Sequence, residues 1–157
     1  MVILEEDQER LSSLLGQLVD ESNSKIVFLV DTSGQQLASA GDLDGVDPTA
    51  LASLTAGNVA ATEGLAQQIG EQGFSSLYHE GDEDSLHLSM VGEKVILLVI
   101  FDEKSSLGLV RLRVKQRTPE LVSVVEEVLN RGDGQAAAVS TAAFADISDE
   151  DIDALFG

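Results

Sequence analysis

Apolar residues at helical spacing mark the first element of the chain. From Leu11 to Val19, leucine and valine side chains recur every three or four positions among acidic and polar residues. The interval 3–21 therefore predicts an amphipathic helix whose apolar side faces a core. A β-branched apolar run follows at Lys25–Val30, and a second segment, Gln35–Ala40, resumes after a turn that ends at Gly34. This pattern predicts a β-hairpin.

A second helix is marked at both ends. Asp47 is a good N-cap, Pro48 suits the first helical position, and Gly70 is a natural terminator. The larger residues of this segment share one side, which we expect to face the sheet: Leu51, Leu54, Asn58, Leu65 and Ile69. The other side carries small residues: Ala52, Ala56, Ala60 and Gly64, with Gly57 close to them.

Three more strands are predicted in the middle of the chain, at 74–79, 85–91 and 94–101. Next, the interval 107–117 alternates apolar and basic residues in its first part. Periodicity alone therefore allows either a strand or the start of a long helix there. Leucine and valine at helical spacing then predict a helix over 121–129.

The chain after Arg131 changes in composition. Small and polar residues without a pattern predict a flexible linker over 132–143, followed by a short tail at 144–157. The expected organisation is thus a core domain over 1–131, a linker and a tail.

Composition narrows the possible partners. The 157 residues include nine Lys or Arg against 28 Asp or Glu, which gives a net charge of -19, and no cysteine. Such acidity argues against binding to nucleic acid or to anionic lipid. The absence of cysteine excludes a disulfide scaffold and a thiolate-bound metal. With 43% apolar residues the chain can bury a real core.

No segment predicts secretion or membrane insertion. The N-terminus lacks a basic region followed by an apolar stretch, and no apolar run approaches the roughly 18 residues of a membrane span. We therefore expect a cytoplasmic protein.

Catalytic signatures are missing from the sequence. It contains no phosphate-binding loop, dinucleotide fingerprint, zinc-protease motif or nucleophile elbow. His79 and Glu80, with Asp82 and Asp84, could form a metal or acid–base cluster, but a strand that ends in an exposed acidic turn is the favoured interpretation. We expect neither an enzyme nor a bound cofactor or metal.

The small-residue side of the second helix needs an explanation. Gly57 and Gly64 lie inside the helix, where each glycine costs roughly 1 kcal/mol relative to alanine. Close approach of another backbone is the usual compensation. The approaching backbone could belong to the same subunit, to a second copy in a homodimer, or to another protein that docks on this flat, uncharged surface.

The tail has the pattern of a short helix. Ser148 and Asp151 resemble a capping box, and Ile147 and Ile152 are placed as a hydrophobic staple. Ile152, Leu155 and Phe156 then share a face. A helix this short needs a groove to order it, either on its own domain or on a partner.

Basic residues concentrate at one place. Arg111, Arg113, Lys115 and Arg117 follow one another closely. They suit a solvated face that balances the acidic first helix. The alternative is a docking patch for an acidic partner, or the source of an arginine finger.

Five segments in order resemble the roadblock (dynein light chain) family. The series 53–61 carries the resemblance, together with the strand 25–31, the turn 79–81 and the run 99–102 with 106–111. The match covers about residues 2–131. It implies a roadblock/profilin-like α+β fold, in which a single antiparallel five-stranded sheet carries helices on both faces. It also favours a final long helix over 107–129, where Pro119 fits poorly.

The resemblance extends to function, through bacterial members that act on a small Ras-like GTPase in cell polarity. It implies a cytoplasmic homodimer, concentrated at a cell pole, that binds the GTP-bound form and stimulates hydrolysis without an inserted arginine. The alternative is a scaffold that binds a GTPase or polarity factor without stimulating hydrolysis. The GTPase-binding face implied by the resemblance comprises Ala52, Thr55, Ala56, Asn58, Val59, Ala60, Glu63 and Gly64. The tail resembles a second docking element of such proteins, with contacts expected from Phe144, Ile147, Ile152, Leu155 and Phe156.

Overall fold

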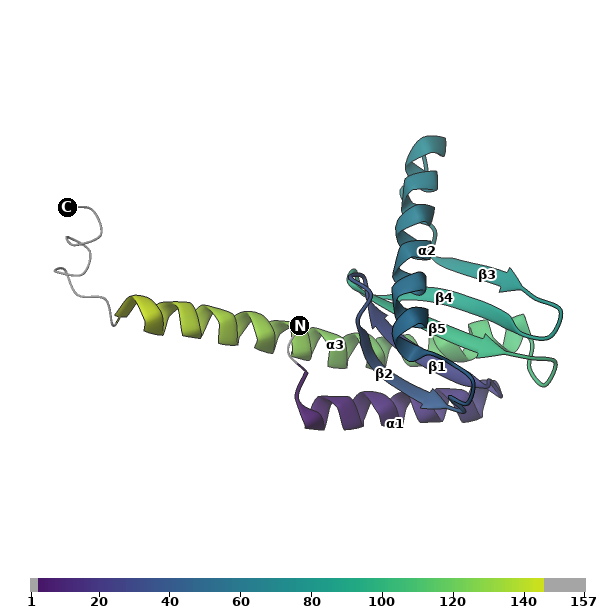
Figure 1. Cartoon of the computed structure of the whole chain (residues 1–157), viewed down its shortest axis with the longest axis horizontal. Helices are drawn as coiled ribbons and strands as arrows, with labels where there is room; N and C mark the ends of the chain where they lie inside the picture. Colours follow the sequence, from purple (N-terminus) through teal and green to yellow (C-terminus); the bar gives the residue numbers. More distant parts are fainter. Residues whose placement is uncertain (1–2, 146–157) are drawn as a thin grey trace.

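The computed structural model describes the backbone of residues 3–145 and the side chains of residues 3–131. The elements in chain order are α1 (Glu5–Ser22), β1 (Ile26–Asp31), β2 (Gln36–Gly41), α2 (Pro48–Ile69), β3 (Ser76–Glu80), β4 (Ser85–Val91), β5 (Val95–Phe101) and α3 (Leu107–Ala145). The strands form one antiparallel sheet in the order β2-β1-β5-β4-β3. Helices α1 and α3 lie on one face and α2 crosses the other (Figure 1). This arrangement confirms the predicted fold.

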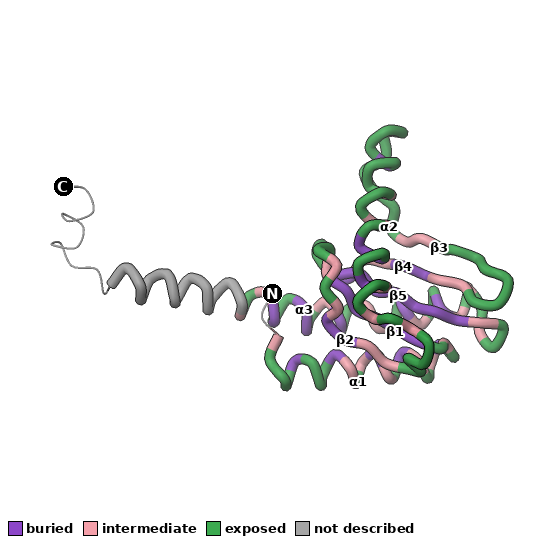
Figure 2. Tube along the Cα trace, in the orientation of Figure 1, coloured by how far each residue is buried: buried purple, intermediate pink, exposed green. Residues whose placement is uncertain are grey.

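The central strands β1 and β5 are apolar on both sides because helices cover both faces. Val27, Leu29, Leu97 and Val99 belong to the core under α1 and α3. Their neighbours along the strands point the other way, and the core under α2 contains Ile26, Phe28, Val30, Ile96, Leu98 and Ile100. Figure 2 shows this burial along β1 and β5, whereas most of α2 is exposed.

Helices α1 and α3 are joined by ion pairs as well as by apolar contacts. Arg10 pairs with Glu127 at 2.8 Å, and Arg117 pairs with Glu21. Arg131 pairs with Asp7, a carboxylate that is only 2% exposed and also accepts a hydrogen bond from the backbone N–H of Leu4. The acidic first helix is therefore balanced by basic residues of α3.

Helix α3 settles the ambiguity over 107–117, because this interval is helical and Pro119 lies inside the helix. A proline has no N–H to donate to the carbonyl four residues earlier, here Lys115. Both residues are exposed, so water can reach this carbonyl. The neighbouring Thr118 Oγ1 donates to Val114 O at 2.7 Å.

The flexible linker predicted over 132–143 is instead helical, because α3 continues to Ala145. Alanine, the best helix former, is abundant there and offsets the two glycines at 132 and 134. Of the predicted tail contacts, Phe144 falls within α3, whereas Ile147, Ile152, Leu155 and Phe156 lie outside the described residues. No helix within residues 3–145 combines the length and apolar composition that crossing a membrane requires.

Candidate functional site

Helix α2 is fixed at both ends as the sequence predicts. Asp47 Oδ1 accepts a hydrogen bond from the backbone N–H of Ala50 at 3.2 Å, and Pro48 opens the helix. Gly70 closes it in the left-handed conformation, with φ of 79°. These caps fix where α2 begins and ends.

The side of α2 that faces the sheet carries members of both predicted sets, so the predicted orientation of the helix is only partly right. Leu51 is half-buried and packs on the core beneath α2, as predicted. Ala52 is 0% exposed, Thr55 5% and Ala56 8%, and Ala66 is also buried. In contrast, Leu54, Leu65 and Ile69 are 72%, 63% and 65% exposed. The physical reason is that Phe28 and the isoleucines of β1 and β5 fill most of the space directly beneath the helix, where small side chains such as that of Ala52 pack closely.

The predicted GTPase-binding face is therefore divided by burial. Ala52, Thr55 and Ala56 are covered by their own sheet and are unavailable to a partner. Asn58 and Val59 are half-buried, and Ala60, Glu63 and Gly64 are exposed. The exposed surface, which we call the outer face of α2, comprises Leu54, Gly57, Ala60, Ala61 and Gly64.

Gly57 and Gly64 contact nothing within their own subunit. A Cβ atom built on either glycine would have no neighbouring atom within 4 Å. The expected close approach of a backbone is thus absent within the described residues of this chain, so a role for these glycines in packing belongs to contacts with another chain.

A different glycine brings the hairpin against α2. Gly34, in the turn between β1 and β2, has a φ of 97°, and a Cβ at this position would lie 3.3 Å from Ser53 Cα. Both the turn and the close approach to the helix favour glycine here. This contact holds the N-terminal half of α2 on the sheet.

The C-terminal half of α2 lies next to an exposed sheet edge. Strand β3 pairs with β4 on one side, and no described strand pairs with its other side. The last turns of α2 rise beyond β3 (Figure 1). A groove of about 400 Å³ separates them from the sheet, and its lining includes Val59, Phe74, Leu77 and Met90.

One polar contact ties α2 to this edge strand. The side-chain nitrogen of Asn58 lies 3.3 Å from His79 Nε2. His79 is therefore a neighbour of α2 and not part of a metal cluster. Within the described residues, no group of histidine and acidic side chains is arranged to hold a metal ion. Asp84, from the acidic turn, pairs with Lys25 at 3.1 Å.

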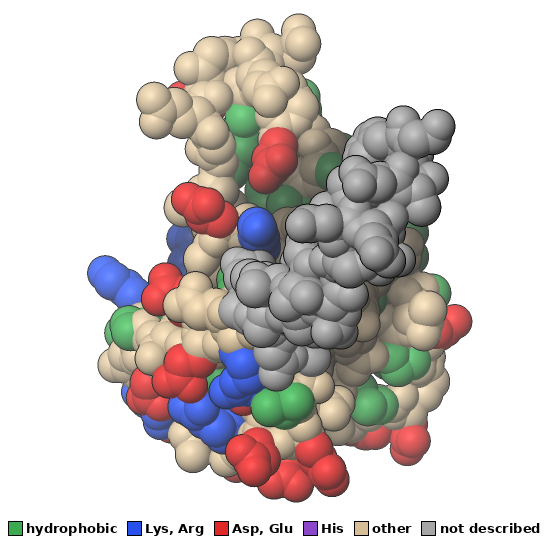
Figure 3. Space-filling model, turned by 90° about the vertical axis from the view of Figure 1, so that its left-hand side faces the viewer, with side chains coloured by type: hydrophobic (Ala, Val, Ile, Leu, Met, Phe, Trp, Pro, Cys, Tyr) green, Lys and Arg blue, Asp and Glu red, His purple; other side chains and the backbone are tan. Residues whose placement is uncertain are grey.

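The electrostatics of α2 differ from those of the rest of the chain. Between Pro48 and Ile69 the only charged residue is Glu63. Figure 3 shows acidic and basic side chains intermixed over the lower part of the molecule, with few charges at the top, where α2 ends. The outer face of α2 thus suits a partner with a neutral, apolar surface.

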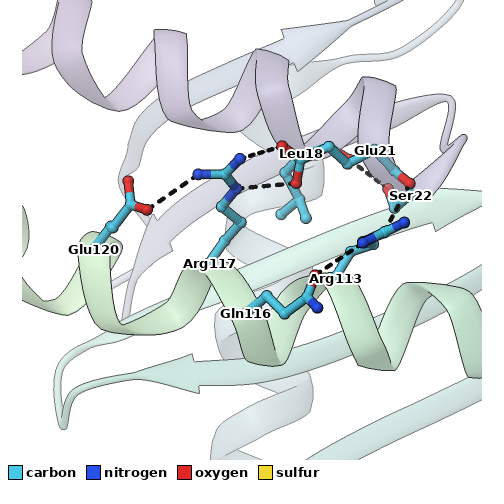
Figure 4. A network of polar contacts seen from close by, with 7 residues as sticks. All are labelled: Leu18, Glu21, Ser22, Arg113, Gln116, Arg117 and Glu120. Carbon is cyan, nitrogen blue, oxygen red and sulfur yellow. Dashed lines mark hydrogen bonds and ion pairs between the residues drawn. The ribbon is translucent and has the colours of Figure 1, made fainter.

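Part of the basic run holds α1 to α3. The Arg117 guanidinium binds the carboxylates of Glu21 and Glu120. Arg113 donates to the backbone carbonyl of Glu21 at 3.2 Å and to Gln116 (Figure 4). The hydrogen bond from Arg117 lowers the pKa of the Glu21 carboxyl, and the same contact raises the pKa of Arg117. These arginines lie across the sheet from α2.

Sequence reasoning missed Leu54, Leu65 and Ile69 as surface residues because it assigned the larger side chains to the core. The available signal was the spacing of Ala52, Thr55 and Ala56, a small stripe that suits the bulky β-branched strands.

Comparison with known proteins agrees with this architecture. The sequence profile of the Roadblock/LC7 domain matches residues 11–101. The structure is similar to that of Myxococcus xanthus MglB, with a TM-score of 0.75 and 49% identity over 81% of this chain and 96% of that one. The gliding protein MglB of Thermus thermophilus gives a TM-score of 0.74 and 32% identity, with the same coverage of both chains.

One more solved structure is similar to this chain. A second MglB structure, described as having a tetrameric arrangement, is also 32% identical, with a TM-score of 0.75 over 81% of this chain and 96% of that one. A search of curated proteins found no significant match.

Proposed function

Because this chain belongs to the Roadblock/LC7 domain family, we propose that it is a regulator of bacterial gliding motility and polarity. In this proposal it acts as a homodimer that binds a small Ras-like GTPase in its GTP-bound form and stimulates GTP hydrolysis. The outer face of α2, uncharged and exposed, is the observation that carries the proposal. The 49% identity to MglB of M. xanthus supports it.

The sheet edge supports the homodimer. An unpaired edge strand is a template for pairing with another chain, and β3 is such a strand among the described elements. Pairing of two β3 strands would carry the last turns of each α2 over the sheet of the other subunit. Leu65 and Ile69 would then enter the partner's groove beside Leu77 and Met90. The tetrameric arrangement described for one MglB structure supports oligomer formation.

The proposed mechanism leaves the chemistry to the GTPase. In GTP hydrolysis, the GTPase's own residues orient the attacking water and stabilise the transferred phosphoryl group. The outer face of α2 offers no arginine or lysine to add to them. It can act by binding the hydrolysis-competent conformation preferentially, and a thousand-fold shift in population requires about 4 kcal/mol of differential affinity.

The residues of the predicted face divide into two roles. In this proposal Ala60, Glu63 and Gly64, which are exposed, contact the GTPase directly, with the half-buried Asn58 and Val59 at the margin. Ala52, Thr55 and Ala56 act through the fold, because their small size sets the distance of α2 from the sheet. The basic residues Arg113 and Arg117 serve the contact between α1 and α3.

We further propose that the tail, 144–157, docks on the GTPase at a second site. Its apolar residues, Ile152, Leu155 and Phe156, suit a groove on a partner. We also propose that the protein is located in the cytoplasm and concentrated at a cell pole.

Single-turnover GTP hydrolysis tests the proposal. The GTPase from the same organism, loaded with GTP, is mixed with excess full-length protein, and we expect the rate to rise by a factor of about 10³. Binding without a rise in rate would identify a scaffold instead. Deletion of 144–157 should weaken binding; unchanged affinity would remove the tail from the interface.

A further inference from the structure

A second surface lies on the opposite side of the sheet from α2. We call it the α3 flank, and it comprises Arg111 and Lys115 on α3, Tyr78 on β3, and His87 and Ser89 on β4. The register of the strands places Tyr78 directly across from His87, and His87 across from Val99, which belongs to the core under α1 and α3. These side chains therefore share the face that α3 covers only in part.

The basic residues of the flank follow β4. Burial lowers the pKa of His87, and the positive charge of Arg111 lowers it further. Further along, Val122 and Val91 line the same hollow, so α3 runs beside β4 from His87 to Val91. Lys115 lies between these two points, one turn after Arg111 on the same side of the helix, at the level of Ser89.

Two polar atoms of the flank have no partner. His87 is only 2% exposed, and neither its Nδ1 nor the Oγ of Ser89 has a hydrogen-bond partner among the described residues. Buried polar groups are usually paired, so these two atoms leave unmet hydrogen-bonding capacity on β4. Tyr78, stacked on Phe101 with ring centres 6.2 Å apart, provides an apolar shelf at the same place.

The charges of the flank are also unpaired. Within residues 3–131, the carboxylates of this acidic protein hold Arg10, Lys25, Arg117 and Arg131 in ion pairs, whereas Arg111 and Lys115 have none. This pair of cations one helical turn apart is set apart by its position beside the unpartnered atoms of β4, since Lys94, Lys104 and Arg113 also lack an ion pair within residues 3–131. It is complementary to a segment that carries carboxylates at matching spacing.

We propose that the α3 flank binds an acidic segment of a partner protein, with its carboxylates on Arg111 and Lys115 and an apolar side chain on Tyr78. The chain's own acidic tail does not reach this site from the same subunit. Thirty helical residues separate Lys115 from Ala145, about 45 Å, and the remaining residues, 146–157, span at most about 40 Å when extended. Because the flank and α2 lie on opposite faces of the sheet, the acidic partner and the GTPase can bind together.

The test uses the full chain and a fluorescent peptide of repeated Glu-Glu-Leu triplets, with a Gln-Gln-Leu peptide as the uncharged probe. We expect the acidic peptide alone to bind, and higher salt to weaken it. The double variant Arg111→Gln/Lys115→Gln should lower the affinity at least ~ten-fold. The matched control, Lys94→Gln/Lys104→Gln, removes the same charge from two other unpaired lysines and should change it less than ~two-fold.

The two histidines give a second, local measurement. NMR signals of the His87 ring should shift when the acidic peptide binds, whereas those of His79, which contacts α2, should stay in place. Equal weakening by both double variants, no binding to the wild-type chain, or an unmoved His87 signal would each overturn the proposal. If deletion of 146–157 raises the affinity for the probe, the occupant is the tail of another copy and the proposed partner is wrong. Stimulated GTP hydrolysis by Arg111→Gln/Lys115→Gln should equal that of the wild type, so this site and the GTPase proposal fail independently.

Discussion

The two faces of the sheet are covered in opposite ways. Under α1 and α3 lies a core of leucine and valine from both helices and strands, closed by ion pairs between the helices. Under α2 the sheet supplies most of the large residues and the helix supplies chiefly alanine and threonine, while Leu54 and Leu65 of α2 point to solvent. The first face completes the fold within one chain. The second leaves apolar surface that another chain can cover.

This difference separates stability from recognition in the molecule. Substitutions under α1 and α3 should act on folding, and those on the outer face of α2 should act on binding. The predictions below test that division, from the largest expected effect to the smallest.

The largest effect is expected from the core under α1 and α3. Leu97 is 0% exposed, so Leu97→Ala should lower the free energy of unfolding by about 2–5 kcal/mol through lost burial and a cavity. Leu54 on α2 is 72% exposed, and Leu54→Ala should cost less than about 0.5 kcal/mol. Urea unfolding at low protein concentration measures both, and similar losses would contradict the division.

The next effect concerns recognition. Gly64→Arg places a long charged side chain on the outer face of α2 and should lower the affinity for the GTPase at least ~ten-fold, measured by titration of stimulated hydrolysis. Gly16→Arg is the matched control, because Gly16 lies inside α1 with nothing within 4 Å of a built Cβ. Ala60→Arg should behave like Gly64→Arg. Intact stimulation in both outer-face variants would exclude this surface.

A smaller effect is expected from the ion pairs between α1 and α3. Arg117→Ala removes the contacts to Glu21 and Glu120 and should lower the melting temperature, whereas Arg111→Ala, which breaks no ion pair, should lower it less. The triple change of Arg111, Arg113 and Arg117 to alanine should leave stimulated hydrolysis within a small factor. A loss of order ~10³ in the triple variant would instead identify an arginine finger.

The smallest effect is a pH dependence from His87. Burial lowers the pKa of this imidazole in the folded chain, and the charge of Arg111 lowers it further. From the other packed strands, Tyr78 and Val99 face it, and neither supplies an opposite charge. The unfolded chain therefore binds more protons near pH 6.5, so the free energy of unfolding contributed by His87 falls as the pH drops below about 7.

Comparison with His87→Gln isolates this contribution. The self-repulsion of the acidic surface changes with pH in both proteins and cancels in the difference. Thermal unfolding at pH 7.5 and 5.5 should show a greater loss, or a smaller gain, in the wild type than in the variant. Identical pH dependence would mean that His87 takes up its proton freely when folded.

Most of the fold could be predicted because its signals are local. Asp47, Pro48 and Gly70 mark the ends of α2 by capping chemistry, and Gly34 marks the hairpin turn. Short turns predict the β1–β2, β3–β4 and β4–β5 pairs, whereas the central β1–β5 pair joins strands far apart in sequence and has no local signal. By contrast, the apolar residues of the interval 107–117 fit both the two-residue repeat of a strand and the 3.6-residue repeat of a helix. Only the packing of this interval on β4 and α1 decides for a helix.

The orientation of α2 could not be predicted from its own sequence. Alanine and glycine lie on both sides of the helix, so its amphipathic pattern is weak. The decisive information is outside the helix: β1 and β5 supply the large residues beneath its N-terminal half, and its last turns rise beyond the sheet, where Leu65 stays exposed (Figure 1). The sequence thus indicates α2 as the exposed helix, but three residues of the predicted face, Ala52, Thr55 and Ala56, are buried against the sheet.

The last turns of α2, which rise beyond strand β3, make the stability of the proposed dimer depend on protein concentration. In the proposed dimer, Leu65 and Ile69 are buried only when a second copy is present. By mass action, the melting temperature must then increase with protein concentration. At a low concentration of this chain, more of it would be the less stable monomer with its apolar residues exposed. The concentration of the protein would then set how much of the proposed dimer is present.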